Sequence, residues 1–243
     1  MYNLEKFTIK DMTNCGAALR KSSVGMANME AVANLIVGHL YDNFINEQDQ
    51  SKSFALVRLF KTHPYIDLEP SLQRVVDQNL GKAPENPQTK CLTLLATAGE
   101  QQAWNTRQDS FGHQAIPLLS ENVVAQSPMI SQLIKQFGLE IGTVLEPDPA
   151  ILVDIEQRSF NVFHIGQALG NPHVPAQAEF VVPYGIKSVL GFGGMLPSGN
   201  LLAVVMFAKV NITRDKADMF KTLALNAKMA LFPFEGKQIF DNQ

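Results

Sequence analysis

Charge and cysteine are both scarce in this sequence. Charged residues make up 18% of it, below the usual share for a soluble domain. The net charge is −3 and no run of lysine and arginine occurs, so a nucleic-acid partner is not expected. The two cysteines, Cys15 and Cys91, lie far apart without C-x-x-C spacing, which argues against a zinc site and a disulfide framework.

Long hydrophobic runs are missing as well. The first residues, M-Y-N-L-E-K-F, contain no apolar signal core. No other run approaches the length that a membrane span needs. We therefore expect a reduced, cytoplasmic, globular protein with no membrane partner.

The common catalytic motifs are also lacking. The sequence has no G-x-S-x-G elbow, Walker loop, H-E-x-x-H or acidic metal loop. Gly191, Gly193 and Gly194 form G-F-G-G, but inside a predicted strand, whereas a phosphate cradle needs helix amides. A bulge or close backbone packing is the alternative reading. No catalytic or metal-binding residue is predicted, and we expect a protein that is not an enzyme.

Apolar residues, at 46%, are abundant and follow regular patterns. Two strands are predicted around the turn P-S-G-N at 197–200. Residues 186–193 alternate, and residues 201–209 are almost wholly apolar, which is typical of a strand buried on both faces. A helix should follow, with Thr213 as its N-cap. One face of that helix is apolar: Phe220, Leu223, Ala227, Ala230 and Leu231.

The earlier part of the chain alternates between helices and strands. Asn28 should cap a helix over 28–44, and residues 54–61 and 91–97 read as paired strands around a helix at 70–80. Ser127 and Pro128 should begin another helix, strands are expected at 116–119 and 159–165, and residues 176–182 suggest helical turns. This order predicts an α+β fold, in which N- and C-terminal helices flank a central, mostly antiparallel sheet.

The C-terminal third resembles a GAF domain. The resemblance lies in Y-G-I-K-S at 184–188, V-L-G-F, a turn, G-N-L-L-A-V-V-M-F and the closing helix. F-H-I-G-Q-A-L-G-N-P-H at 163–173 is similar to the family's D-A-x-x-D-P-R lead-in, without its acidic positions. The resemblance implies a PAS/GAF/profilin-type fold over 28–234, with an atypical middle section at 99–154. Residues 1–27 would be an N-terminal helical extension and 235–243 a tail.

GAF domains are sensor segments of bacterial histidine kinases and nucleotide cyclases. The resemblance therefore implies a non-catalytic sensory module of signal transduction, which binds a small molecule between the sheet and segments 99–116 and 163–184. Its terminal helices would signal to a separate kinase or cyclase. A ligand-free dimerisation or scaffold domain is the alternative. The candidate ligand-binding residues are Arg58, Phe60, Trp104, Arg107, His113, His164, Tyr184 and Phe192.

Each candidate also has an ordinary structural explanation. Arg58 lies among apolar neighbours, which invites an anionic partner, but its head could be solvated at a sheet edge. Trp104, Arg107 and His113 could close over a ligand, or aromatic residues could simply pin their loop to the body. His164 could ligate a metal or haem, although a lone strand histidine usually serves only as a hydrogen-bonding group.

Cys91 and the last helix support two further hypotheses. A small redox enzyme could use Cys91, but a buried cysteine acting as a small hydrophobe explains it as well. The sequence lacks the adjacent Cys-His pair that would suggest bilin attachment. The cofactor is left open, and haem or another chromophore is one possibility. Met219, Leu225 and Met229 extend the apolar surface of the last helix. That excess predicts a homodimer, or else contact with the N-terminal helices of the same chain.

Overall fold

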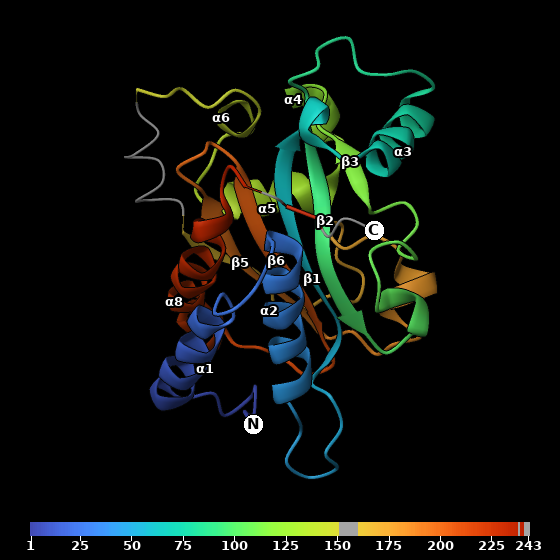
Figure 1. The fold of residues 1–243 in the computed structure, drawn as a ribbon. Helices are drawn as coiled ribbons and strands as arrows, with labels where there is room; N and C mark the ends of the chain where they lie inside the picture. Colours follow the sequence, from blue (N-terminus) through green and yellow to red (C-terminus); the bar gives the residue numbers. More distant parts are fainter. Residues whose placement is uncertain (151–159, 238, 241–243) are drawn as a thin grey trace.

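The computed structural model describes residues 1–150, 160–237, 239 and 240, which form an antiparallel sheet with helices on both faces (Figure 1). The six strands have the order β3-β2-β1-β6-β5-β4. This arrangement confirms the predicted α+β class with a central antiparallel sheet and flanking helices. The strands are β1 Phe54–Pro64, β2 Lys90–Gly99, β3 Ala115–Pro117, β4 Asn161–Ile165, β5 Ser188–Met195 and β6 Leu201–Ala208.

The predicted hairpin forms the middle of the sheet. Strand β5 pairs with β6 from Ser188 opposite Ala208 to Met195 opposite Leu201, and β6 pairs with β1 on its other side. Every residue of β6 is buried, as its almost continuous apolar sequence predicts. The predicted pairing of the first two strands, β1 and β2, is also confirmed.

One face of the sheet, called the helical face here, is covered by α1, α2 and α8 (Figure 1). Local sequence explains where these helices begin. Thr8 and Asp11 form a capping box at α1, and the Asn28 side chain accepts from the Ala31 amide at α2. Thr213 precedes α8 as predicted, but its side chain makes no capping hydrogen bond. The bounds are α1 Ile9–Lys21, α2 Met29–Asn43 and α8 Arg214–Leu231.

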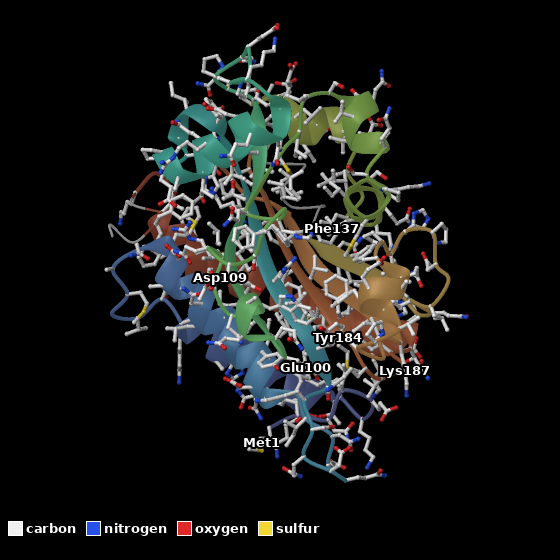
Figure 2. The ribbon with its side chains drawn as sticks, turned by 90° about the vertical axis from the view of Figure 1, so that its right-hand side faces the viewer. Met1, Glu100, Asp109, Phe137, Tyr184 and Lys187 are labelled. Atoms are coloured by element: carbon white, nitrogen blue, oxygen red, sulfur yellow. The ribbon has the colours of Figure 1, made fainter. Side chains whose placement is uncertain are left out.

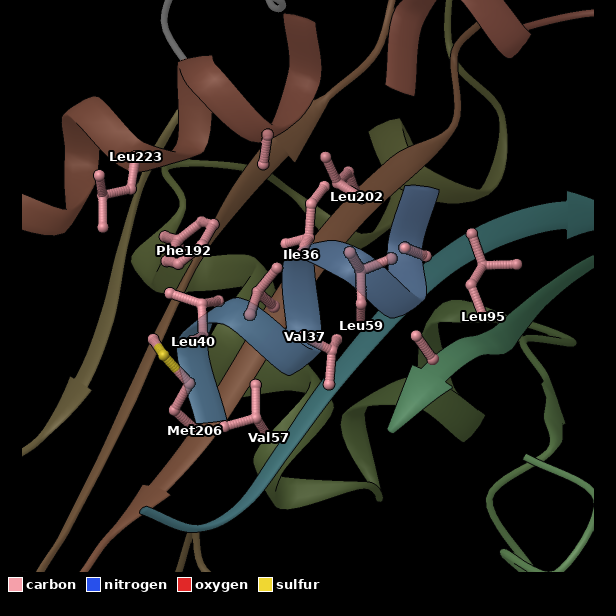
Figure 3. Close-up of a cluster of buried hydrophobic side chains, with 14 of the residues drawn as sticks. Ile36, Val37, Leu40, Val57, Leu59, Leu95, Phe192, Leu202, Met206 and Leu223 are labelled. Carbon is pink, nitrogen blue, oxygen red and sulfur yellow. The ribbon is translucent and has the colours of Figure 1, made fainter. Parts of the chain in front are cut away.

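The core of the helical face lies between these helices and the central strands. Ile36 and Leu40 of α2 and Leu223 of α8 pack over Phe192 and Met206 of β5 and β6 (Figure 3). All five side chains are fully buried. This layer provides the apolar burial on which most of the stability rests.

The opposite face, called the loop face, is covered by short helices and two long connections, 99–114 and 166–187 (Figure 2). Its own core includes Leu133, Ile134 and Phe137 from the α5 region, packed against the sheet. Further elements lie along the edge and in the connections. They are α3 Pro70–Leu80, α4 Glu121–Ala125, α5 Pro128–Gln136, α6 Ile141–Leu145, η1 Tyr65–Asp67, η2 Gln102–Trp104, η3 Gln177–Val181 and η4 Phe232–Phe234.

One sequence-based explanation for a residue of β1 is wrong. Arg58 does not lie at a sheet edge, because β1 sits between β2 and β6. Phe54 and Leu56 face opposite sides of the sheet, because the pairing with β6 is irregular between them, and Phe54 joins the core of the helical face. The short helices α4 and α6 were not predicted, since five residues are too few to show a helical period.

The ends of the chain pack onto the same cores. Leu4, Phe7, Cys15 and Leu19 belong to the core of the helical face, together with residues of α2 and α8. Phe240 is also buried there. Residues 151–154 of the expected middle section, Ser159 of the expected strand, and residues 238 and 241–243 of the expected tail lie outside the described residues, and the proposed boundaries stay predictions. Within the described ranges, none of the helices combines the length and the apolar character needed to cross a membrane.

Candidate functional site

Arg58 is a buried cation that has no counter-ion among the described residues. Its side chain projects from the middle of β1 and the residue is only 7% exposed. Its Nε atom has no hydrogen-bond partner among the described residues. Burial lowers the pKa of its guanidinium to about 10, and no neighbouring carboxylate in the described part of the chain opposes this shift. An unpaired charge in a protein interior is strongly unfavourable, so the presence of arginine at this buried position needs an explanation.

Arg58 lies on the loop face. It is directly opposite Val205 of β6 and Thr97 of β2, and Val205 belongs to the core of the loop face. Residues directly opposite each other in a sheet share a face. Leu56 and Phe60, two positions away along β1, are in the same core. Two of the predicted ligand-binding residues, Arg58 and Phe60, are therefore neighbours on one surface.

Aromatic side chains cover this face beside Arg58. The ring of Trp104 lies 4.7 Å from that of Tyr184 and 5.4 Å from that of Phe180, and Phe180 makes an edge contact with Phe207 at 4.9 Å. We call Trp104, Phe180, Tyr184 and Phe207 the aromatic cluster. Figure 2 shows Tyr184 over this face of the sheet, with Phe137 farther along the same face. Segments 99–114 and 166–187 thus meet over the strands, at the place where the sequence predicted a ligand.

The segment 99–114 is attached to the sheet beside Arg58. The Thr97 hydroxyl donates to the Trp104 carbonyl at 2.8 Å, and the Gly99 amide donates to the Asn105 side chain at 2.9 Å. His113 is exposed near the other end of the segment, with Nδ1 3.2 Å from the Phe111 carbonyl oxygen. Its pKa is lowered, first by desolvation and then by the Arg58 guanidinium. Arg58 and His113 are therefore electrostatic neighbours, and this surrounding favours the neutral form of His113.

Arg107 is placed differently. Its guanidinium donates to Glu30 at 2.6 Å and to Glu69 at 2.8 Å, and all three side chains are at least three-quarters buried. Glu30 belongs to α2 and Glu69 precedes α3. Arg107 is thus held by two carboxylates of this chain, and its part in a ligand pocket with Arg58 stays a prediction.

His164 and Phe192 lie on the helical face. His164 pairs with Leu190, a residue of that core, and its Nε2 is 2.8 Å from the Ile212 carbonyl oxygen. Phe192 packs among residues of α2 and α8 (Figure 3). The expectation that His164 points toward the predicted pocket is wrong, because the sheet separates it from Arg58. The ordinary explanation, a histidine hydrogen-bonded within the fold, describes its contacts.

The G-F-G-G stretch is explained by close packing. A side chain at Gly193 would meet the Leu202 carbonyl group on β6, and one at Gly191 would meet the Val204 carbonyl and Phe163. The register between β5 and β6 runs without a shift, so close backbone packing rather than a bulge accounts for the glycines.

The surface is hollowed at another place. A cavity of about 450 Å³ lies between residues 86–90, the start of α4, and α6. None of the eight predicted ligand-binding residues lines it. It brings together Lys90, Glu121 and Glu146, whose mixed charges favour no single class of ligand.

Cys91 is a poor candidate for redox chemistry. It is fully buried in the core of the helical face, and burial raises the pKa of its thiol to about 12. Its Sγ donates weakly to the Thr89 carbonyl at 3.8 Å. Reactive cysteines need a thiolate in a partly exposed, electropositive setting, so the packing explanation fits Cys91 better. Across the residues that the structure covers, no three side chains of the metal-binding types gather into a possible metal site.

Sequence reasoning missed a buried basic group at the end of β1. Lys61 and His63 are each only 2% exposed on the helical face, and Lys90 lies nearby. Lys61 pairs with Glu235 at 3.3 Å, and Lys90 donates to Asn200 at 2.7 Å. Burial, then Lys61 and Lys90, hold the pKa of His63 well below its usual range. The polar run K-T-H after an apolar strand was the signal that could have found this group.

His63 should make the fold sensitive to acid. An unfolded histidine binds a proton near about pH 6.5, whereas folded His63 stays neutral to lower pH. Below about pH 6.5 the unfolded state binds more protons than the folded state. The free energy of unfolding therefore decreases as the pH is lowered, by up to about 1.4 kcal/mol per pH unit. We expect His63→Leu to flatten the profile measured by urea unfolding between pH 7.5 and pH 5. Parallel profiles for variant and parent would contradict this role.

Comparison with known proteins gives structural neighbours only. No protein-family model matches the chain, and no curated protein sequence is similar to it. The GAF domain of a phosphoenolpyruvate-protein phosphotransferase from Acinetobacter is 10% identical, with 94% of this chain and 97% of that chain covered and a TM-score of 0.48. A phycoerythrobilin-bound GAF domain of a cyanobacterial phytochrome is 10% identical, with 94% and 98% covered and a TM-score of 0.39. The N-acylhomoserine-lactone-dependent LuxR-family transcription factor CepR2 of Burkholderia cenocepacia is 11% identical, with 93% and 96% covered and a TM-score of 0.37.

Two of these neighbours are GAF domains. At such identities and TM-scores, the likeness says nothing about ligand, activity or partner. The fold class is established by the order and pairing of the strands of this chain itself.

Proposed function

We propose that this chain is a regulatory module that binds a small molecule bearing an anionic group, with Arg58 as the anion's partner. The observation that carries the proposal is the burial of the Arg58 guanidinium without a carboxylate or a partner for Nε among the described residues. A carboxylate or phosphate group would supply the missing hydrogen bonds in the two-pronged geometry that a guanidinium favours.

The surroundings of Arg58 favour a particular kind of ligand. A single guanidinium, near a histidine whose neutral form is favoured, matches a group with one negative charge better than a polyphosphate. The aromatic cluster beside it offers apolar ring surface. Binding sites for small molecules commonly combine such apolar walls with a few placed polar groups. An organic monocarboxylate with a flat or apolar body is the ligand class that fits both features.

A role in regulation, rather than turnover, is supported by the chemistry on the loop face. Arg58 can anchor and orient an anion but cannot act as a nucleophile or general base at neutral pH. Signalling through the terminal helices would require the ligand to bind one arrangement of α1 and α8 more tightly than another. The predicted resemblance to sensor segments supports this role, and a separate kinase or cyclase stays the expected effector.

The proposal is tested by ligand retention and ligand titration. Native mass spectrometry of the purified protein, with an absorbance spectrum, reports a retained molecule or a chromophore. Titration with benzoate should raise the melting temperature of the protein. Inorganic phosphate, titrated for comparison, should raise it less. The absence of a retained molecule, together with no effect of either anion, would favour the ligand-free scaffold and overturn the proposal.

A homodimer through α8 is a second proposal. Leu225 is 47% exposed and Met229 is 46% exposed, and they lie one turn apart on α8. Met219, the other predicted dimer residue, instead packs against the core of the helical face. The exposed stripe thus supports an interface with a second copy, while Met219 supports the alternative of contact within the chain.

Charge on this stripe should prevent dimerisation. We expect the double variant Leu225→Lys, Met229→Lys to be monomeric in native mass spectrometry while the parent is dimeric, because two lysines would be desolvated in an apolar interface. Lys221→Glu, on an exposed position of the same helix, serves as a control for altered charge. A monomeric parent protein at micromolar concentration would rule the dimer out.

A further inference from the structure

The C-terminal segment, residues 232–237, 239 and 240, is attached to the body at three points. Glu235 pairs with buried Lys61 at 3.3 Å. The Glu30 amide donates to the Ile239 carbonyl at 2.8 Å. Phe240, only 7% exposed, lies against His63 with ring centroids 6.1 Å apart. This segment therefore follows α8 back across the helical face instead of leaving the domain.

Phe240 also contacts Arg107. The centre of the Arg107 guanidinium lies 4.7 Å from the centroid of the Phe240 ring, within the range of a cation–π interaction. Arg107 belongs to segment 99–114, and its two ion pairs join that segment to Glu30 and Glu69. Glu30 thus contacts both Arg107 and, through its amide, the C-terminal segment. One compact polar junction holds the two segments together.

The same segment 99–114 carries Trp104 and His113, which lie at the candidate site. Internal hydrogen bonds hold its second half, residues 106–114, together. Ser110 donates to the Thr106 carbonyl at 2.9 Å, and Gln114 donates to the Gln108 carbonyl at 2.6 Å. Arg107 thus lies in the same hydrogen-bonded stretch as His113, and Trp104 lies three residues before it in the chain.

We propose that Arg107 is a positioning residue that couples docking of the C-terminal segment to the anion site at Arg58. Its part in ligand binding rests on the proposed function above. Docked Phe240 and the Glu30–Arg107–Glu69 ion pairs hold Arg107 in place, and Arg107 shares segment 99–114 with Trp104 and His113. By thermodynamic reciprocity, a ligand that binds under this segment strengthens docking of the C-terminal segment, and loss of docking weakens ligand binding by the same factor.

Trp104 makes this coupling measurable without any ligand, because it is the protein's single tryptophan. Phe240→Ala removes the ring on Arg107, and Phe232→Ala, at an exposed position of the same segment, is the matched control. We expect Phe240→Ala to shift Trp104 emission and raise its acrylamide quenching at least twofold. Phe232→Ala should leave both unchanged, and Phe240→Leu should restore part of the parent signal. Equal Trp104 behaviour in Phe240→Ala and Phe232→Ala would overturn the coupling.

A benzoate titration followed by Trp104 emission then connects the coupling with the ligand. We expect Phe240→Ala to weaken apparent benzoate affinity at least threefold and Phe232→Ala to leave it unchanged. If benzoate binds both variants equally, the coupling is overturned. If benzoate does not bind even the parent protein, the failure belongs to the proposed function, and the ligand-free Trp104 measurement still decides whether the C-terminal segment positions segment 99–114.

Discussion

Replacing Arg58 with methionine is expected to raise the free energy of unfolding of the ligand-free protein, by about 1–4 kcal/mol. Methionine keeps the length and apolar contacts of the arginine stem but removes a guanidinium that is buried without a carboxylate among the described residues. The same change should abolish the benzoate-induced rise in melting temperature. Stability is measured by urea unfolding, with the slope of the transition checked for unchanged compactness.

Arg107 provides the matched control for this experiment. Its guanidinium is buried like that of Arg58, but Glu30 and Glu69 pair with it. Removing one partner from a buried ion pair leaves uncompensated charge, so Arg107→Met should lower the free energy of unfolding by about 3–5 kcal/mol. Opposite signs for the two arginines would identify Arg58 as a binding residue. A loss of stability in Arg58→Met comparable to that in Arg107→Met would show that Arg58 is structural.

Truncating Phe220 to alanine is expected to lower the free energy of unfolding by about 3–5 kcal/mol. This side chain, fully buried on α8, lies 5.1 Å from the ring of Phe7 and 5.7 Å from that of Phe44. Its loss would leave a cavity where α8 meets α2 and the N-terminal residues, and these packed elements cannot collapse fully into it. Chemical unfolding measures the effect.

Phe232→Ala is the control for Phe220→Ala. The two residues lie at the inner and outer surfaces of the same C-terminal region, and Phe232 is 48% exposed. Surface substitutions usually change stability by less than about 0.5 kcal/mol. Similar losses in the two variants would contradict the packing of α8 onto the sheet, since that packing is what distinguishes them.

Local sequence signals predicted the elements with strong boundaries. Asn28 precedes α2, and Pro70 and Gly81 bracket α3, because each residue type favours a helix start or stop whatever its distant neighbours are. Gly81 has the positive φ of 74° that glycine adopts readily at a helix end. The hairpin 188–208 was equally readable, since apolar runs on both sides of a turn pair with each other directly.

Distant contacts decided the candidate site, and local patterns gave no access to them. Arg107 pairs with Glu30, 77 residues away in the sequence, and with Glu69, 38 residues away. The residues next to Arg107 in the sequence therefore do not reveal these ion pairs. Strand alternation predicts which residues share a face with His164 or Phe192. It does not predict which face of the sheet α2 and α8 cover, and the packed structure shows that both residues lie on that face. Proximity of His113 to Arg58 likewise arises from the fold of segment 99–114.

By itself, the sequence determined the order of the elements and the buried character of the central strands. These properties follow from periodicity and capping, which act over a few neighbouring residues. The tertiary structure decided which charged residues are buried and which of them found a partner. Arg107 and Lys61 met carboxylates from distant segments, and Arg58 met none among the described residues. Ion pairing depends on distance in space, which a linear pattern does not contain.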